Sequence, residues 1–455
     1  MKEKYAKRIH IFLIAILILS ACEANGEKLD LGNFDDTLVA EQFVIWWPFE
    51  AGVPYQSFAA ETLNKRFPNT QFQFIHFNTP PHQGFFSGGN TSSGLIEMMR
   101  SQPSPDVIVF DTRFLSLMIE TEYLEPIPDA YGVEMDYDII TEHRTLAPDL
   151  SLYALPFGRI AEGLFYNKKF FDEMKVPYPK DGITWDGVIE LGGVFKKGRW
   201  SPIGVTAFDS MASQLSLRLY DAETEWFDFE SDEWKELTRT LVDMNDLEDF
   251  RAHLDGGRTT HSHSLSFSKG EIAMLVSPLF GHKGSGKTGM LHYESNLSFY
   301  EVDWDIASFP DFDDGNRLQP ASQMLGIGIP KRSANKEDAL KVISHLLSRE
   351  VQLDNSQKGL ISSRADAASF GDEFGRYSIL AGKSVAALLS DGPRGVRDPI
   401  FEFVKHMNGS LESMVYGDDI WRDIIVERIQ KLIRERTANM IHDRQKFIEE
   451  MRRKF

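Results

Sequence analysis

Short apolar segments alternate with helix-forming segments along the first quarter of this chain, and few folds accommodate that order. Residues 42–47, 70–76 and 106–111 each have the length and apolar pattern of a strand. Residues 52–66, between the first two, have the apolar periodicity of a helix. Strand, helix and strand in this order are typical of a mostly parallel sheet covered by helices, so the sequence predicts an α/β fold.

The same alternation continues through the rest of the chain. We expect further strands at 152–157, 160–167, 272–276 and 303–309, and helices at 168–174, 184–197, 233–247, 335–349 and 418–454. Pro156 and Gly158 are expected to end the strand that begins at 152, and Thr184 is a suitable N-cap. A chain of 455 residues is long enough for two or three domains.

The N-terminus has the composition of an export signal. Basic residues precede an apolar run of nine residues, Ile11–Leu19, which is too short to span a membrane, since spanning needs about 20. The sequence Leu-Ser-Ala-Cys then ends at Cys22, the single cysteine of the chain, and resembles the bacterial lipobox. We therefore expect a lipoprotein signal peptide at 1–21, lipidation of Cys22, and a polar tether at 22–37.

Composition excludes several kinds of protein. The 49 basic and 68 acidic residues give a net charge of −19, which disfavours a broad nucleic-acid-binding surface. One cysteine excludes a disulfide framework and a cysteine-rich metal site, and no cofactor is expected. With the signal, these properties predict an extracytoplasmic protein held by lipid on a bacterial membrane, at either a periplasmic or a cell-wall face.

An ordered set of motifs resembles one family. They are LYALPFG at 152–158, LFYNKKFF at 164–171, PYP at 177–179, TWD at 184–186, FSKGEIAM at 267–274 and IPK at 329–331. Each motif alone is short, but their order from about residue 42 to 365 is similar to that of the sugar-type extracellular solute-binding proteins of ABC importers, the maltose-binding-protein-like group.

This resemblance implies a two-lobed fold, in which each lobe is a mostly parallel sheet flanked by helices and hinge crossovers join the lobes. Residues 38–150 and 310–372 would form lobe one, and residues 151–309 and 373–455 lobe two. A carbohydrate, expected to be an oligosaccharide, would bind in the cleft and the lobes would close around it. Its partners would be ABC permease subunits, and the protein would be a monomer without enzymatic activity.

A sugar site needs aromatic planes for stacking and fixed polar groups for hydroxyls, and such groups are expected after strand ends. Trp46 and Trp47 end the first strand, and one of them could line the cleft; packing of both in the core is the alternative. Asp111 and Arg113 follow the strand 106–110, where the resemblance implies contacts to sugar hydroxyls; a surface ion pair is the alternative.

Five further residues are candidates. Phe208 and Asp209 follow a strand-like segment, and Phe280 occupies the place of a stacking tryptophan in the resembled family. Tyr153 lies near the expected hinge. Arg364 follows the 335–349 helix and could either approach the cleft or bind a helix terminus.

Other functions stay open. A tethered glycan hydrolase would need two carboxylates across a cleft, and 68 acids cannot exclude such a pair. A ligand-presenting sensor of the same fold is a third possibility. Residues 281–288 match the phosphate-binding loop GxxxxGK[ST], but no clear helix follows, and His261 and His263 have no evident further metal ligands.

Overall fold

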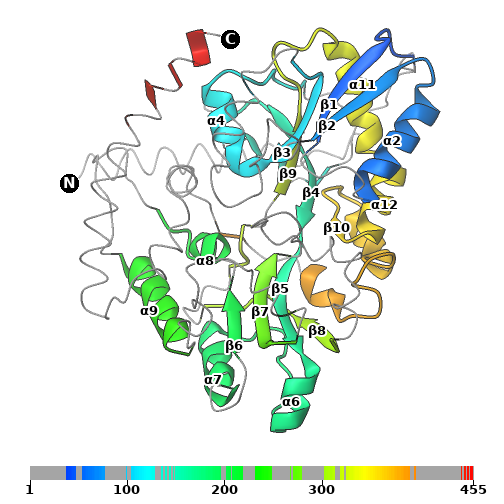
Figure 1. Cartoon of the computed structure of the whole chain (residues 1–455). Coiled ribbons are helices and arrows are strands. Elements are labelled where there is room, and N and C mark those ends of the chain that lie inside the picture. Colours follow the sequence, from blue (N-terminus) through cyan, green and yellow to red (C-terminus); the bar gives the residue numbers. More distant parts are fainter. Residues whose placement is uncertain are drawn as a thin grey trace, which may run out of the picture.

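The structure is a computed structural model, which describes residues 37–47, 54–76, 99, 104–128, 135–136, 139–140, 143–144, 147, 149–195, 201–205, 208–218, 231–247, 267, 270–278, 302–312, 318–321, 324–389, 394–395, 442, 445–446, 448–449 and 451–453. It contains two β-sheets with helices packed around them, which confirms the predicted α/β class (Figure 1). No helix in these described residues is long and apolar enough to cross a membrane.

The first sheet has six strands in the order β10-β4-β9-β3-β1-β2. The strands are β1 (Gln42–Trp47), β2 (Gln71–His76), β3 (Val107–Asp111), β4 (Ala154–Ile160), β9 (Met324–Gly328) and β10 (Leu360–Ile361). Helix α2 (Pro54–Arg66) connects the parallel strands β1 and β2, as the apolar pattern predicts. Short segments η1 (Thr112–Phe114) and α4 (Leu115–Glu120) follow β3 directly.

The second sheet has four strands in the order β6-β7-β5-β8. They are β5 (Glu162–Asn167), β6 (Ser201–Val205), β7 (Ile272–Pro278) and β8 (Trp304–Ala307), and the helices around them are α6 (Lys168–Met174), α7 (Trp185–Phe195), α8 (Phe208–Gln214) and α9 (Asp232–Leu247). Thr184 caps α7, because its hydroxyl accepts a hydrogen bond from the Gly187 amide at 3.1 Å.

Both sheets are mixed, and not mostly parallel as expected. Strand β1 runs parallel to β2 and β3, and β6 runs parallel to β7. The other pairings are antiparallel: β3 with β9, β4 with β9 and β10, and β5 with β7 and β8. The reason is that β9 comes back from the second sheet and inserts between β3 and β4, so it runs against both.

The predicted end of a strand at Pro156 and Gly158 is wrong. Strand β4 continues to Ile160, and a register shift against β9 between these two residues forms an irregularity that accommodates the proline, which has no amide hydrogen to donate. Because β4 belongs to the first sheet and β5 to the second, the chain crosses between sheets at Ala161. The expected lobe boundary at 150 precedes this crossover, with β4 between them.

The single helix expected at 335–349 is two helices, α11 (Lys336–Leu346) and α12 (Arg349–Gln357). Ser348 separates them with an extended backbone, and its hydroxyl accepts a hydrogen bond from the Val351 amide. A serine in this conformation is a favoured N-cap, so a new helix begins after it.

Three apolar clusters surround the sheets. One contains Phe43 of the first sheet and Phe165 of the second, a second packs under α7 and α9, and a third lies on the α4 side of the first sheet. Ile448 and Met451 belong to this third cluster, and the Arg452 Nε donates to the Glu120 carbonyl at 2.7 Å. These two residues thus pack on the first sheet (Figure 1), although residues 373–455 were expected in lobe two, because their apolar side chains are buried in this cluster.

Candidate functional site

The strand directions place the carboxyl ends of most strands at the junction of the two sheets. Strand β4 ends at Ile160 and β5 begins at Glu162, so only Ala161 separates the sheets here. In the first sheet β9 runs antiparallel to both β4 and β3, so β3 ends at the junction like β4. Strand β1 is parallel to β3, and β2 is parallel to β1, so both also end there. In the second sheet β7 and β8 run antiparallel to β5, which begins at the junction, so both end there. Strand β6 is parallel to β7 and ends there too.

The carboxyl ends of these seven strands therefore face the junction. In α/β sheets, ligands bind outside the carboxyl ends of the strands, because the loops there are free to vary while the sheet holds them in place. The junction is the candidate functional site. Most of the residues predicted from the sequence lie at the ends of β1 and β3 or after β3, β6 and β7 in the sequence, namely Trp46, Trp47, Asp111, Arg113, Phe208, Asp209 and Phe280.

Asp111 and Arg113 form a buried ion pair at the end of β3. The Arg113 Nη2 and Nε lie 2.7 and 2.8 Å from Asp111 Oδ2, and both side chains are 1% exposed. Asp111 Oδ1 also accepts the Arg113 amide at 3.0 Å, which caps η1. The pair is not the surface ion pair considered from the sequence, and Asp111 aligns with Leu325 of β9, at the junction end of the sheet.

Trp46 and Trp47 are both buried, with 2% and 0% of their surface exposed. Their side chains point to opposite faces of β1, because Trp47 belongs to the cluster that includes Phe43, and Trp46 to the cluster that includes Met451. The Trp47 ring packs edge-on against Phe157, with centroids 5.6 Å apart. Both indoles thus serve the core in this structure.

The two candidates after β6 lie at the start of helix α8, which begins at Phe208 and continues through Asp209. The end of α8 holds a crossover segment in place. The Gln214 amide donates to the Pro310 and Leu318 carbonyls at 3.0 and 3.2 Å, and the Ser213 hydroxyl accepts the Ala321 amide at 2.9 Å. Phe280 and Cys22 lie outside the described residues.

Tyr153 lies at the other end of the sheet. It directly precedes β4, and the carboxyl end of β4 lies at the junction. Tyr153 is therefore separated from the site by the length of the strand. Its hydroxyl donates to the Asp149 carboxylate at 3.2 Å. Partial burial, and then the hydrogen bond to Asp149, raise the pKa of Tyr153.

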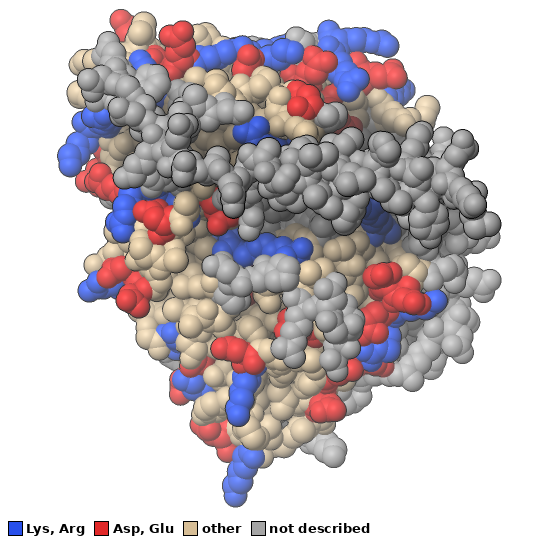
Figure 2. All heavy atoms as spheres, turned by 180° about the vertical axis from the view of Figure 1, so that it is seen from behind, with Lys and Arg blue, Asp and Glu red and all other residues tan. Residues whose placement is uncertain are grey.

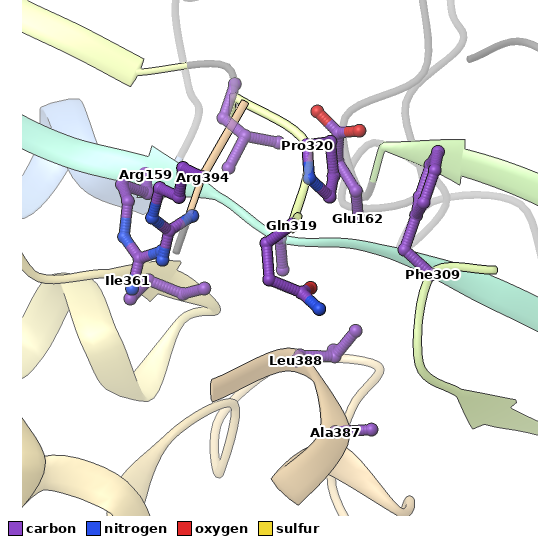
Figure 3. A pocket seen from close by; sticks show the side chains of 11 residues that line it. Arg159, Glu162, Phe309, Gln319, Pro320, Ile361, Ala387, Leu388 and Arg394 are labelled. Atoms are coloured by element: carbon purple, nitrogen blue, oxygen red, sulfur yellow. The ribbon is translucent and has the colours of Figure 1, made fainter. Parts of the chain in front are cut away.

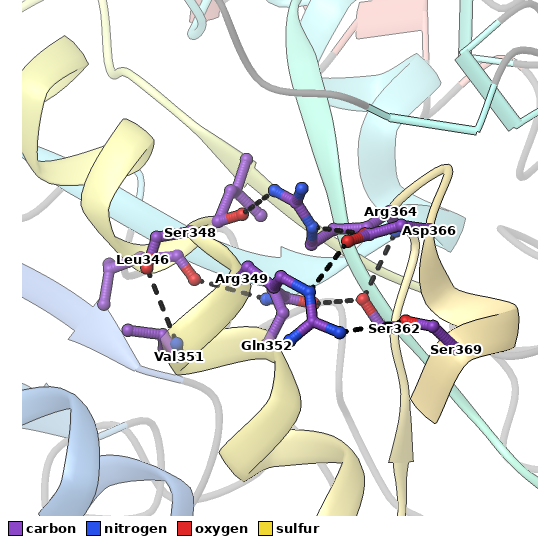
Figure 4. Close-up of polar contacts among 10 residues, drawn as sticks. Leu346, Ser348, Arg349, Val351, Gln352, Ser362, Arg364, Asp366 and Ser369 are labelled. Carbon is purple, nitrogen blue, oxygen red and sulfur yellow. Dashed lines mark hydrogen bonds and ion pairs between the residues drawn. The ribbon is translucent and has the colours of Figure 1, made fainter. Parts of the chain in front are cut away.

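Arg364 is part of a polar network behind helices α11 and α12 (Figure 4). Its Nη1 donates to the Leu347 carbonyl at 3.0 Å, and its Nε lies 2.7 Å from Asp366 Oδ1. Strand β10 runs antiparallel to β4, so the chain after Ile361 leads away from the junction. Arg364 therefore hydrogen-bonds a carbonyl at the C-terminal end of α11, which is the alternative considered from the sequence.

A small cavity of about 20 Å³ lies at the junction itself, and sequence reasoning missed it (Figure 3). Its polar lining side chains are Arg159, Glu162, Gln319 and Arg394, and its apolar ones include Phe309, Ile361 and Leu388. Arg159 and Glu162 flank the crossover at Ala161 in the sequence, which was the one local signal. The other residues come from segments more than 140 positions away, and no sequence pattern connects them.

The face seen in Figure 2 carries interspersed acidic and basic side chains on its described part. Among the described residues, no group of three or more histidine, cysteine or acidic side chains could hold a metal ion.

Comparison with known proteins gives a family match over most of the chain. Residues 47–353 match the model of the bacterial extracellular solute-binding proteins. No curated protein sequence matches at a significant level.

Solved structures share the fold. An ABC transporter solute-binding protein from Thermotoga lettingae bound with alpha-D-tagatose is 18% identical, with a TM-score of 0.61 over 90% of this chain and 100% of that one. Maltose-bound MalE3 of T. maritima is 15% identical, with a TM-score of 0.62 over 88% and 99%. An ABC substrate-binding protein from Listeria monocytogenes in complex with cycloalternan is 16% identical, with a TM-score of 0.61 over 88% and 98%. The similarity confirms the predicted two-lobed α/β fold.

Proposed function

Since the chain belongs to the bacterial extracellular solute-binding proteins, we propose that it captures a carbohydrate at the junction of its two sheets and delivers it to the permease of an ABC importer. The observation that carries the proposal is the convergence of seven strand carboxyl ends on that junction. Structures of the same fold that hold tagatose, maltose or cycloalternan support a carbohydrate ligand. This role requires no catalysis.

The two sheets are the cores of two lobes that close on the ligand. The first lobe comprises 38–160, the strands β9 and β10 and the C-terminal residues 448–453, and the second comprises 162–309. Three segments connect them: Ala161, the stretch between β8 and β9, and the stretch after β10. Hinge closure needs only a few residues to change their backbone angles, and a one-residue crossover such as Ala161 concentrates the change.

Ligand contacts would come from the segments that follow the junction-facing strands. Phe280 and the α8 residues Phe208 and Asp209 are the predicted residues that remain candidates for direct contact. Buried Asp111 and Arg113 would instead hold the end of β3 in place, so that the segments beside it present the ligand-binding groups.

The N-terminus would attach the protein to the outer face of the cytoplasmic membrane through a lipid on Cys22, and the body would act as a monomer. One acyl chain binds membranes only weakly, so a stable anchor requires the multiple chains of a bacterial lipoprotein. In a fractionation experiment, the wild-type protein should sediment with membranes and the Cys22→Ser variant should not.

Thermal unfolding of the purified protein against a panel of mono- and oligosaccharides tests the proposed function. A ligand at about 100 times its dissociation constant stabilises the folded state by roughly 2.7 kcal/mol, which raises the melting temperature by a few degrees. A reproducible increase with one class of sugar would support capture. Release of products from a polysaccharide above a no-protein control would show instead that the chain is a hydrolase.

A further inference from the structure

We infer that a basic helical surface on the first lobe lies against anionic phospholipid headgroups and turns that lobe toward the membrane. The surface belongs to the described helical residues 442, 445–446, 448–449 and 451–453, which we call the C-terminal helical segment. The inference rests on the proposed lipid anchor at Cys22 and does not depend on which solute the protein captures. It combines the place where the anchored end of the chain enters the lobe with the charges exposed beside that place.

The N-terminal part of the chain enters the first lobe at the end of the sheet opposite the junction, which we call the outer end. Strand β1 begins there, because its carboxyl end faces the junction. Helix α11 fixes the chain just before β1, since Asp338 Oδ2 accepts the amides of Val39 and Ala40, both at 2.8 Å. A lipid on Cys22 would therefore hold the protein by its outer end.

The distance from that lipid to the lobe is limited by the length of the chain. Fourteen residues, 23–36, separate Cys22 from Thr37, the first described residue. A chain of this length spans at most about 50 Å even when fully extended. The outer end therefore stays close to the headgroups, and a weak attraction to them acts at a high effective concentration.

The C-terminal helical segment reaches the same outer end. The Arg452 Nε donates to the carbonyl of Glu120, the last residue of α4, at 2.7 Å. Two residues further on, the Glu122 carboxylate pairs at 3.0 Å with Lys331, which follows β9. Strand β9 runs antiparallel to β3 and so leads away from the junction. Figure 1 shows the segment, in red, beside α4.

One side of the segment is buried and the other is exposed. Ile448 and Met451 are 7% and 0% exposed and belong to the cluster that includes residues of α4. Residues three or four positions apart lie on the same side of a helix, so the residues between these two face away from the lobe. The exposed charged residues of the segment are Lys446, Glu449, Arg452 and Arg453.

This exposed side is basic in an acidic protein. Three of its four charged residues are basic, whereas the whole chain has a net charge of −19. The sequence 428–454, which includes the segment, has nine basic and four acidic residues. Ion pairs balance neighbouring charges of the outer end, such as Lys331 with Glu122 at 3.0 Å and Lys336 with Glu125 at 2.8 Å. The segment is thus the part of this end that complements an anionic surface.

An anionic bilayer is the partner that these charges fit. Each lysine or arginine close to anionic headgroups strengthens the attraction about fivefold. A basic surface beside a lipid chain is a common second signal for membrane attachment. The junction lies at the other end of the first lobe, so this contact leaves the candidate site away from the bilayer.

Fluorescence quenching on vesicles tests the inference with the lipidated protein. The single cysteine of the chain would carry the lipid, so a dye on Gln445→Cys, at an exposed position of the segment, labels one place only. A lipid with a quencher on its headgroup then reports contact. We expect quenching on phosphatidylcholine vesicles that contain phosphatidylglycerol and none on phosphatidylcholine alone. Higher salt should reduce the quenching, because it screens exposed charges.

Variants of opposite sign separate this attraction from misfolding. Lys446→Gln and Arg453→Gln should each lower the ratio of membrane-bound to unbound lobe about fivefold, and Glu449→Gln should raise it about fivefold. A misfolded protein cannot mimic the gain. Lys169→Gln is the matched control, because Lys169 also pairs with an acid four residues on, at 3.9 Å against 3.8 Å for Arg453, and it is similarly exposed. It begins α6, which follows the carboxyl end of β5 away from the junction, and it should change nothing.

Equal quenching with and without phosphatidylglycerol would overturn the inference, as would unchanged quenching in both basic-residue variants. Contact that occurs only when a permease is present would show a protein partner instead and would also overturn it. If sugars stabilise the protein but the label never meets the headgroups, this inference fails and the proposed capture of a carbohydrate stands. If Cys22 carries no lipid, the anchor and this inference fail together.

Discussion

Replacement of Asp111 by asparagine tests whether the end of β3 is held by a buried ion pair. Asp111 Oδ2 accepts two hydrogen bonds from the Arg113 guanidinium at 2.7 and 2.8 Å, and Oδ1 accepts the Arg113 amide at 3.0 Å. Asparagine keeps the shape and one acceptor oxygen. Its amide nitrogen would face the guanidinium, and two donors would then point at each other.

The expected loss of stability follows from the burial of both side chains, which are 1% exposed. The change removes the Asp111 charge that pairs with the buried Arg113 cation, and breaking a buried pair typically costs about 3–5 kcal/mol. A surface pair would contribute about 0–1 kcal/mol. The double variant Asp111→Asn/Arg113→Met also removes the stranded cation, so it should be more stable than Asp111→Asn alone.

Urea unfolding followed by tryptophan fluorescence gives the free energies, since the midpoint shifts while the slope stays the same if only stability changes. Arg376→Met breaks the exposed pair between Arg376 and Glu373 and serves as the control that should leave the midpoint in place. A midpoint for Asp111→Asn within about 0.5 kcal/mol of wild type would refute the reasoning, as would a double variant less stable than the single one.

Three further predictions concern other positions. Burial lowers the pKa of His143 to about 4, below its unfolded value of about 6.5. The unfolded state therefore binds more protons, and the free energy of unfolding falls as the pH decreases from about 6.5 to 4. When unfolding is measured across this pH range, His143→Asn should lose about 3 kcal/mol less of its free energy of unfolding than the wild type. Arg364→Met removes the hydrogen bond to the Leu347 carbonyl and should destabilise the protein by about 1.5–3 kcal/mol, while sugar affinity stays unchanged. A weaker sugar affinity with normal stability would show instead that Arg364 contributes to binding. In Gly395→Ala the new methyl group would overlap the Ser213 backbone carbonyl, so the melting temperature should drop, corresponding to a loss of about 1–3 kcal/mol; an unchanged melting temperature would contradict this.

Local patterns predicted the kinds and approximate bounds of the elements. The strands β1, β2, β3 and β7 and the helices α2, α6 and α9 lie within a few residues of their predicted positions. Each of these elements follows from the periodicity of apolar side chains along consecutive residues of one segment. The ordered motifs likewise indicated the family and the two-lobed fold.

Strand direction and site assembly could not be predicted in this way. The antiparallel insertion of β9 joins residues more than 160 positions apart, and the continuation of β4 through Pro156 depends on that partner. The Asp111–Arg113 pair was identified as a candidate, but its burial depends on the elements around it. The direction in which Arg364 leaves β10 follows from its antiparallel pairing with β4.

The sequence by itself determined the class of the fold, the elements, the family and the acidic overall charge, because each is a property of local pattern or of a sum over residues. Only the tertiary structure decided which strand ends meet, which charged groups are buried and which side chains line the junction cavity. Those properties depend on contacts between distant segments, such as Arg159, Gln319 and Arg394, whose proximity no local interaction specifies.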